Sequence, residues 1–569
     1  MKKHVPCFLR GWQLLGYSLL IMLVTVSNAR AQAPIWQFVA PIGGSGTTVT
    51  ATTTDAISNV YMAGNFSGTV SMGNSTLSAV GGQDVFVAKW SSATSTIVWA
   101  QRAGSTSDDH AFALAVSGAS VYVAGDFLGT ATFGSTQLVS RGNNDGFVAK
   151  LTDGSTSATW SWALMLGGTA SDQAYALAAN GPNVYVGGVF NSYTALFGPI
   201  SVTNAFIGGS TADGFVARLT DTGLAVAVAW VQPVSGTGSD FVTSLATAGN
   251  AIIVGGQFSN TLAFGGTVLV GSSLTGFVGK LLDTGTASHY AWAVQTNGIA
   301  IINAVAVDGA SVYVTGRFLF NAAFGSSSFT SAGMIGGYDV FVAKITDSGS
   351  SAAFTWAMQA GGVASDYANA IVASKGNVYV TGGFSLTSSF GSTSLTGVGT
   401  ADNIFLAKLT DAGSTGSFAW VIAAGGGNSQ QALGLATGMS GRVYVSGSMM
   451  PAAVFGPISV SGEGSGGVGF LASLTDPTLT ASAAALRPES IGLYPNPACG
   501  HATVQLPPTS GPVTLTLLDA IGRSVRTHAV LLPTAGLNYK LDITSLPAGI
   551  YALRVATGTQ TATRRLVVE

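Results

Sequence analysis

The stretch Val121-Tyr122-Val123-Ala124-Gly125-Asp126-Phe127 decides the fold of this 569-residue chain, because its pattern recurs along most of the sequence. β-branched and aromatic residues alternate in it with small ones, which is typical of a β-strand. Its tyrosine returns in five other copies and is an isoleucine in a sixth, and a glycine always stands three residues later. A fixed internal period indicates a repeat architecture. The tyrosine position holds Tyr61, Tyr122, Tyr185, Ile253, Tyr313, Tyr379 and Tyr444.

Seven tryptophans mark the same copies, at intervals of 62 to 68 residues. Glycine is abundant, with 77 residues, and charged residues make up only 8% of the chain. This composition favours packed strands and turns over charged disorder. We expect each tryptophan to open one copy of the repeat. The seven are Trp36, Trp99, Trp162, Trp230, Trp292, Trp356 and Trp420.

The second copy predicts four strands, at residues 111–116, 121–127, 146–151 and 162–165, with Gly-containing turns between them. Small residues in the first strand suit the crowded centre of a β-propeller, and the bulky tryptophan suits its wide rim. We therefore predict an all-β fold with a seven-bladed β-propeller over residues 34–476. A solenoid is the alternative, but about 63 residues is long for one β-helical coil.

The two ends of the repeat array predict how the ring closes. The seventh copy supplies three strands, the last at residues 469–474, and no eighth tryptophan follows it. The segment at residues 36–39 reads as an outer strand but has no preceding blade. We predict that it becomes the outer strand of the last blade, which removes the exposed sheet edges.

The sixth copy shows the motif in full: Trp356, Gly361, Gly362, Ser365, Asp366, Asn377–Phe384, Phe390, Gly391 and residues 405–408. This pattern resembles the bacterial β-propeller repeat often called the SBBP repeat. The resemblance covers roughly residues 36–476 and departs at Ile253, at Met449 and at Ser473, where the motif has Tyr, Phe and Lys. It implies a propeller with no settled biochemical role, so it implies no active site.

The N-terminus has the features of a secretory signal peptide. Lys2, Lys3 and Arg10 precede or open an apolar stretch at residues 14–26, and Ala29-Arg30-Ala31 offers a cleavage site. We predict a signal peptide at residues 1–31. After its removal, no stretch is long and apolar enough to span a membrane.

Charge and cysteine content narrow the classes of partner. Residues 34–480 carry 20 Asp/Glu against 11 Lys/Arg, and a mildly acidic surface disfavours nucleic acid. Cys7 leaves with the signal peptide, so the mature chain keeps only Cys499 and forms no internal disulfide.

The period ends near residue 476, and a low-complexity linker at 477–490 leads to a second domain at 491–569, which we predict to be a small Ig-like β-sandwich. Four motifs follow in order there: Tyr-Pro-Asn-Pro at 494–497, Leu-Asp-Ala-Ile-Gly-Arg at 518–523, Leu-Pro-Ala-Gly-Ile-Tyr at 546–551 and Arg-Leu-Val-Val at 565–568.

These motifs are similar to those of the C-terminal sorting domain of the type IX secretion system. The resemblance implies that residues 491–569 bind that secretion machinery and direct the protein across the outer membrane of a Gram-negative bacterium. Removal of the tail, with release or attachment to surface lipopolysaccharide, is the usual fate in that family. We expect a secreted or cell-surface protein. An ordinary Ig-like accessory domain is the alternative.

The strand order places the variable excursions at residues 199–212 and 326–337 on one face of the ring, opposite the face from which the tail leaves. Four aspartates, each ten residues after its tryptophan, lie on the same variable face. An incomplete ring of carboxylates suits a cation or sugar hydroxyls. The other interpretation, which we favour, is that each aspartate binds loose backbone N–H groups. They are Asp109, Asp172, Asp240 and Asp366, and Gly46, Ile302 and Gln430 interrupt the series.

A basic residue recurs in the third strand, with an aspartate three residues later in most copies, and we expect these residues to form ion pairs rather than a binding stripe. The basic residues are Lys89, Lys150, Arg218, Lys280, Lys344 and Lys408. The turn aspartates are Asp153, Asp221, Asp283, Asp347 and Asp411.

Residues for catalysis are scarce. The repeat region holds two histidines, His110 and His289, and one glutamate, Glu463, and it lacks the nucleophile and nucleotide motifs. We predict no catalytic residues, no metal site, no cofactor and no enzyme activity. The favoured function is a secreted binding or adhesion module with an extracellular glycan or surface ligand. The alternatives are a scaffold without a ligand and a polysaccharide-active enzyme.

Overall fold

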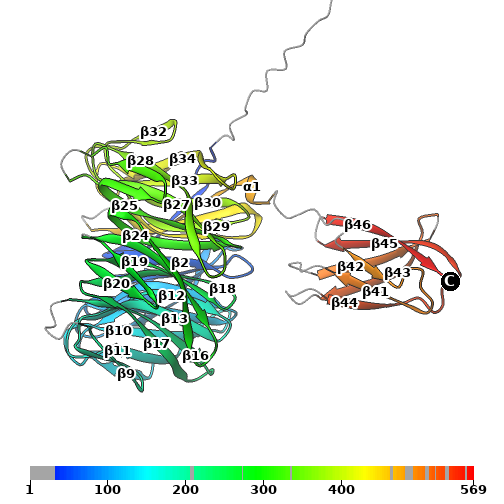
Figure 1. Cartoon of the computed structure of the whole chain (residues 1–569), viewed down its shortest axis with the longest axis horizontal. Coiled ribbons are helices and arrows are strands. Elements are labelled where there is room, and N and C mark those ends of the chain that lie inside the picture. Colours follow the sequence, from blue (N-terminus) through cyan, green and yellow to red (C-terminus); the bar gives the residue numbers. More distant parts are fainter. Residues whose placement is uncertain are drawn as a thin grey trace, which may run out of the picture. The chain divides into compact units, whose positions relative to one another are not determined.

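The structure is a computed structural model. It describes residues 33–205, 211–271, 273–333, 336–461, 466–480, 491–506, 512–519, 521–531, 537–557 and 560–569. The predicted signal peptide, most of the predicted linker and Glu463 lie outside these residues. The described chain is all-β, as predicted, and its strands are coloured from blue through green and yellow to red along the sequence (Figure 1). None of its helices in the described ranges has the length and hydropathy needed to cross a bilayer.

The repeat region forms seven antiparallel sheets, each built on four strands in chain order, which we number 1 to 7. The first strands are β2 (Thr47–Thr54), β6 (His110–Ser117), β12 (Asp172–Asn180), β18 (Asp240–Ala248), β24 (Asn297–Asp308), β29 (Tyr367–Ser374) and β35 (Gln430–Thr437). The second strands are β3 (Val60–Met72), β7 (Ser120–Phe127), β13 (Asn183–Phe190), β19 (Ala251–Phe258), β25 (Ser311–Phe324), β30 (Asn377–Phe384) and β36 (Arg442–Met449).

The third strands are β4 (Ser75–Ser91), β10 (Asp145–Asp153), β16 (Asp213–Asp221), β22 (Thr275–Asp283), β27 (Asp339–Asp347), β33 (Asn403–Asp411) and β39 (Val468–Thr475). The fourth strands are β5 (Thr96–Ala103), β11 (Ala158–Gly167), β17 (Val226–Gly236), β23 (Ser288–Gln295), β28 (Ala352–Gly362), β34 (Gly416–Gly426) and, in sheet 7, β1 (Phe38–Ser45). Two short helices, η1 (Met439–Gly441) and α1 (Pro477–Thr480), complete the repeat region.

The connection between second and third strands is more ordered than the sequence predicts. In sheet 2 it forms a hairpin of β8 (Thr130–Phe133) and β9 (Thr136–Val139), turning at Gly134 with a φ of 61°. Most of these hairpins pair with the fourth strand of the preceding sheet and so cover its edge. The others are β14 (Thr194–Phe197) with β15 (Ile200–Thr203), β20 (Thr261–Phe264) with β21 (Thr267–Val270), β31 (Thr387–Phe390) with β32 (Thr393–Thr396), and β37 (Ala453–Phe455) with β38 (Ile458–Val460).

Sheet 7 contains both ends of the repeat region, as predicted. Strand β1 pairs antiparallel with β39, and Phe38 lies opposite Ser473. The prediction that Trp36 is the first of seven equivalent tryptophans is wrong, because Phe38 occupies that register position. Trp36 instead matches Trp160: it packs edge-on against Phe455 with ring centroids 5.5 Å apart. The regular interval before Trp99 is therefore a coincidence of spacing.

The seven first strands contact one another in cyclic order, and β35 contacts β2 as well as β29. Each first strand has a β-bulge at the same position, where one extra residue stands opposite the second strand. A bulge re-aims a side chain and increases local twist. We call the seven extra residues the bulge positions: Thr50, Phe112, Tyr175, Thr243, Asn303, Asn369 and Leu433.

One buried aspartate joins each pair of neighbouring sheets from 1 to 7. Between sheets 5 and 6, Asp411 Oδ2 accepts hydrogen bonds from Lys344 Nζ at 2.6 Å and Tyr313 Oη at 2.7 Å, and Oδ1 accepts one from Trp356 Nε1 at 3.0 Å. We call this arrangement the junction cluster. Its ion pairs are Lys89–Asp153, Lys150–Asp221, Arg218–Asp283, Lys280–Asp347, Lys344–Asp411 and Lys408–Asp476.

The predicted pairing of these basic residues is confirmed, but the predicted partner is wrong. Each cation binds the aspartate of the next sheet rather than the one three residues ahead in its own strand. Residues three apart in a strand point to opposite faces, so only the neighbouring sheet brings the carboxylate within reach.

The junction between sheets 7 and 1 keeps only the tyrosine of the cluster, Tyr444. Ser473 replaces the lysine, Phe38 replaces the tryptophan and Ser92 stands where the aspartate would be. The Tyr444 hydroxyl consequently has no hydrogen-bond partner. Phe38 packs instead against Trp90, with ring centroids 5.3 Å apart. Apolar packing thus replaces the ion pair, an exchange that other proteins tolerate well.

The C-terminal region, residues 491–569, forms two antiparallel sheets that share one apolar core of residues such as Val504, Leu515, Leu541 and Leu553. The first sheet is β40 (Gly492–Tyr494), β41 (His501–Leu506) and β44 (Leu537–Asp542). The second is β43 (Ser524–Leu531), β42 (Pro512–Leu518), β45 (Gly549–Thr557) and β46 (Gln560–Val568).

Removing a junction aspartate should destabilise the repeat region strongly. Asp411→Ala leaves the Lys344 ammonium buried without a counter-charge, so we expect a loss of about 3–5 kcal/mol in the free energy of unfolding in urea. The exposed Asp108→Asn should change it by less than about 0.5 kcal/mol. Burial opposes ionisation, but Lys344, Tyr313 and Trp356 hold the pKa of Asp411 below its ordinary value. The contribution of this carboxylate is therefore present above about pH 4 and is lost as pH falls further. Equal stability of both variants would contradict the assigned role.

Candidate functional site

The first strands surround a cavity of about 200 Å³ that we call the channel. Each of the seven strands contributes its bulge residue and the two residues that follow it. The lining contains no charged residue: it consists of Ala, Leu, Val, Ile and Gly with Thr, Ser, Asn, Phe and Tyr. The channel therefore combines apolar side chains with hydroxyl and amide groups, a combination that suits an uncharged polar ligand.

Four of the seven bulge side chains each form a hydrogen bond to the backbone of the next sheet. Thr50 Oγ1 donates a hydrogen bond to the Ala111 carbonyl at 2.7 Å, and Thr243 Oγ1 donates one to the Ile302 carbonyl at 2.6 Å. The Asn303 and Asn369 amides make the equivalent bonds, at 2.8 Å and 2.9 Å. These bonds use the amide donors, and the amide oxygens retain lone pairs for other hydrogen bonds.

The bulge positions vary where the neighbouring positions repeat. The tyrosine, glycine and basic positions are nearly constant among the copies, while the bulge positions hold Thr, Phe, Tyr, Asn and Leu. A residue type that the architecture required would recur as those do. The variation therefore marks the channel wall as the part of the repeat that the fold leaves free.

Aromatic residues gather on one side of the channel, in sheets 2 and 3. The Phe112 ring lies against Tyr175, with centroids 5.2 Å apart, and stacks on His110 at 5.9 Å with an interplanar angle of 15°. All three side chains are partly exposed. We call His110, Phe112 and Tyr175 the aromatic sector.

A buried carboxylate fixes the aromatic sector. Asp126 accepts hydrogen bonds from His110 Nδ1 at 2.8 Å and from the Asn144 and Gln173 amides at 3.1 Å. Gln173 in turn accepts the Tyr175 hydroxyl at 2.5 Å. The bond to Asp126 raises the pKa of His110, and burial with the charge of Asp126 raises the pKa of Tyr175 to about 12. The sector is thus held by hydrogen bonds and ring contacts while its three side chains remain partly exposed.

The four predicted site aspartates are buried, and the structure does not gather them into one site. Asp172 accepts bonds from the Gly168, Asn191 and Ser192 backbone N–H groups, at 2.7, 2.9 and 3.1 Å. Asp109 and Asp366 also accept backbone N–H groups. Within the described ranges, no three His, Cys, Asp or Glu side chains come close enough to hold a metal ion. Each of the four predicted aspartates instead lies beside a second aspartate, and the period of the sequence alone does not reveal this neighbour.

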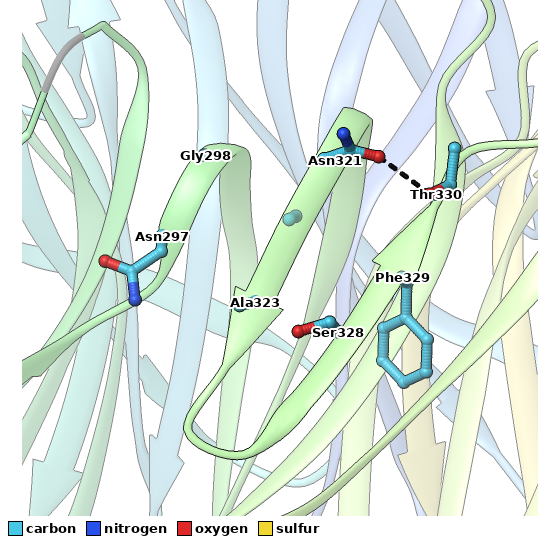
Figure 2. Close-up of a pocket in the computed structure, with 8 residues that line it drawn as sticks. Asn297, Gly298, Asn321, Ala323, Ser328, Phe329 and Thr330 are labelled. Atoms are coloured by element: carbon cyan, nitrogen blue, oxygen red, sulfur yellow. Dashed lines mark hydrogen bonds between the residues drawn. The ribbon is translucent and has the colours of Figure 1, made fainter.

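A larger cavity, of about 290 Å³, lies on the rim at sheet 5 (Figure 2). There β26 (Ser327–Thr330) pairs with the end of β25, which also pairs with Asn297 and Gly298, shortly after β23 of the preceding sheet. Its polar groups are Asn297, Asn321, Ser328 and Thr330, and Thr330 Oγ1 donates to Asn321 Oδ1 at 2.7 Å. Its lining comes from β24, β25 and β26 alone and holds one ring, Phe329, whereas all seven first strands line the channel, so we take the channel as the candidate site.

Three motifs of the C-terminal region have local structural roles. The Asn496 amide pairs with the backbone of β46, donating to the Arg565 carbonyl at 2.7 Å and accepting the Val567 N–H at 2.8 Å. Asp519 accepts the Ile521 and Arg523 N–H groups. The Tyr551 hydroxyl donates to the Pro547 carbonyl at 2.9 Å.

Comparison with known families matches residues 492–569 to the secretion system C-terminal sorting domain. The predicted type IX sorting tail is therefore confirmed, and it indicates export by the type IX secretion system and a secreted or cell-surface protein of Bacteroidetes-type bacteria. Comparison of the whole chain with curated proteins finds no match.

Proposed function

We propose that the repeat region is a closed seven-bladed β-propeller of the SBBP type that binds an extracellular glycan, and that the sorting tail exports it. Seven four-stranded sheets, first strands in cyclic contact and a terminal strand shared between both chain ends support the ring. The sorting-domain match at residues 492–569 supports export. Residues 1–31 would act as the signal peptide for the inner membrane.

The aromatic sector beside an uncharged channel is the observation that carries the binding function. A sugar ring presents an apolar face of C–H groups and a rim of hydroxyls. Phe112 and Tyr175 offer ring surfaces for the apolar face. The channel also offers hydroxyl and amide oxygens, including those of Asn303 and Asn369, to sugar hydroxyls.

The absence of charged residues from the channel lining favours some classes of ligand over others. Its lining has no cation to pair with an acidic ligand, and burying an unpaired charge is costly. Asp126 is already bound by three donors, so it does not offer a free carboxylate for a basic ligand. We therefore assign a neutral glycan rather than a uronic acid polymer or a polyamine.

Export can be tested by deleting residues 492–569. The full chain should reach the medium or the cell surface, and the truncated chain should remain in the periplasm, as measured by cell fractionation and immunoblotting in a bacterium with a type IX system. Secretion of the truncated chain at the level of the full chain would contradict the assignment of the tail.

Binding can be tested by calorimetry of the full chain with neutral hexasaccharides of glucan, mannan, xylan and galactan. We expect Phe112→Ala and Tyr175→Ala to weaken binding at least tenfold, about 1.4 kcal/mol, because each removes a ring surface. Tyr175→Phe keeps the ring and should retain most of the affinity. Phe320→Ala, an exposed aromatic outside the channel, serves as the control and should bind normally.

The outcome has two informative failures. If Phe320→Ala and Phe112→Ala reduce binding equally, the binding site does not lie in the channel. Failure of all four neutral oligosaccharides to bind, or preference for oligogalacturonate, would reject the neutral-glycan assignment and favour a scaffold without such a ligand.

A further inference from the structure

Five sheet junctions place two polar residues side by side at the same point. The first residue opens or lies in a third strand, and the second comes at the start of the next first strand. In each, the second residue's N–H donates to the carbonyl just before the first residue, at 2.7–2.9 Å. The pairs are Asp84–Asp109, Asp145–Asp172, Asp213–Asp240, Asp339–Asp366 and Asn403–Gln430.

The aspartates of these pairs are deeply buried, and several of their oxygens lack a donor. All eight are at most 1% exposed. The oxygen Oδ1 of Asp145, Asp213 and Asp339 has no hydrogen-bond partner, and neither oxygen of Asp240 has one. A buried acceptor without a donor is costly, and a buried unpaired charge costs more. Such atoms in a native structure call for an unseen partner.

Two of the five pairs show what the position requires. Arg102 Nη1 lies 2.5 Å from Asp84 Oδ2, so a cation offsets one carboxylate of the first pair. The junction between sheets 6 and 7 has amides in place of both carboxyls, and the Gln430 amide donates to the Asn428 and Met450 carbonyls at 3.1 Å. One pair is thus partly compensated by arginine, and another is neutral by composition.

The other three pairs have no such compensation within the described residues. None of their six carboxyls forms an ion pair with a described lysine, arginine or histidine. In the first of these pairs the two acids approach closely. A Cβ added to Gly167 would lie 2.2 Å from Asp145 Oδ1 and 2.7 Å from Asp172 Oδ2, so both oxygens close on the same glycine.

We infer that Asp145–Asp172, Asp213–Asp240 and Asp339–Asp366 each bind one proton at neutral pH, shared as a carboxylic acid donating to a carboxylate. The proton comes from solvent on folding, and each uptake forms one O–H bond and removes one negative charge. A protonated carboxyl supplies the donor that the bare oxygens lack. Asn403 and Gln430 supply neutral groups at the same place by composition.

The surroundings agree with this assignment. Burial, with the charge of the partner, raises the pKa of Asp145 to about 7, of Asp240 to about 8 and of Asp366 to about 7. Burial alone raises the pKa of Asp213 and Asp339 to about 6. The other titratable groups nearby are Arg141, whose backbone N–H donates to Asp145 and whose charge opposes the rise in the pKa of Asp145, and Tyr367, whose pKa Asp366 raises.

A divalent metal ion is the rival occupant, and the geometry disfavours it. Calcium takes six to eight oxygen ligands, whereas each pair offers two carboxyls with no third acidic or histidine side chain among the described residues.

Infrared titration of the full chain tests the inference. Ordinary aspartates are ionised above about pH 4, so the carbonyl stretch of a protonated carboxylic acid at pH 6 reports on shifted groups. We expect this band at pH 6 and its loss as pH rises through 8. Asp240→Asn should remove the contribution of one pair, while the exposed Asp108→Asn should leave the band unchanged. Asp213→Asn, which reproduces the natural residue of the sixth sheet, replaces Asp240→Asn if that variant fails to fold.

The same pairs predict the direction of a stability change. Their folded pKa values exceed the unfolded value of about 3.9, so their stabilising contribution is full below that pH and is lost as pH rises through 6–8. Asp240→Asn should therefore reduce the fall in unfolding free energy between pH 5 and pH 8. An absent band at pH 6, or a band that Asp240→Asn leaves intact, would overturn the inference. Stoichiometric metal in chain purified without chelator, lost in that variant, would also overturn it.

Discussion

The junction cluster is the interaction on which the repeat region depends. A single carboxylate accepts a cation, a tyrosine hydroxyl and an indole N–H from the neighbouring sheet, and burial makes each bond directional and costly to lose. Because the donors come from three different strands, the cluster fixes the register of one sheet and its angle to the next. The Tyr, Trp and Lys positions of the repeat are therefore constant for one reason, because all three side chains bind the same aspartate. They are the donors, and the turn aspartate is their acceptor.

The junction between sheets 7 and 1 is different because it joins the two ends of the chain. Lysine, tryptophan and aspartate are all replaced there, and Phe38 packs against Trp90 instead. The charged members of the cluster are replaced together, which is expected because either one left buried without its partner would destabilise the fold. Strand pairing between β1 and β39 then holds this junction. The first and last strands of the repeat region therefore associate through backbone hydrogen bonds and apolar contacts.

The sequence predicted the strands well where a period was present, and less well where partners lie in another copy. The four strands of the second copy and the shared sheet of β1 and β39 follow from alternation and from counting copies. Trp36 was misassigned because spacing cannot distinguish two positions that are both aromatic in some copies. The partner of Lys344 was misassigned because the contact spans 67 residues. The aspartate pairs escaped notice because their members belong to different strands, and the bulge positions escaped it because a bulge leaves no sequence signal.

The constant and the variable positions of the repeat have different structural roles. Constant positions build junctions and strand ends, while the variable bulge positions line the channel and give it an uncharged, locally aromatic wall. The paired aspartates belong to the constant part, since arginine, amides or a shared proton each reduce the buried negative charge at the same point. Rigid junctions around a variable wall are a physical basis for a binding scaffold.

Native-state amide hydrogen exchange of residues 38–45 tests the closure of the ring most directly. If β1 is the outer strand of sheet 7, its amides should exchange as slowly as those of β39 at residues 468–475, since the two strands share one ladder. Exchange of β1 within seconds, with β39 still protected, would show an open end and contradict the closed ring.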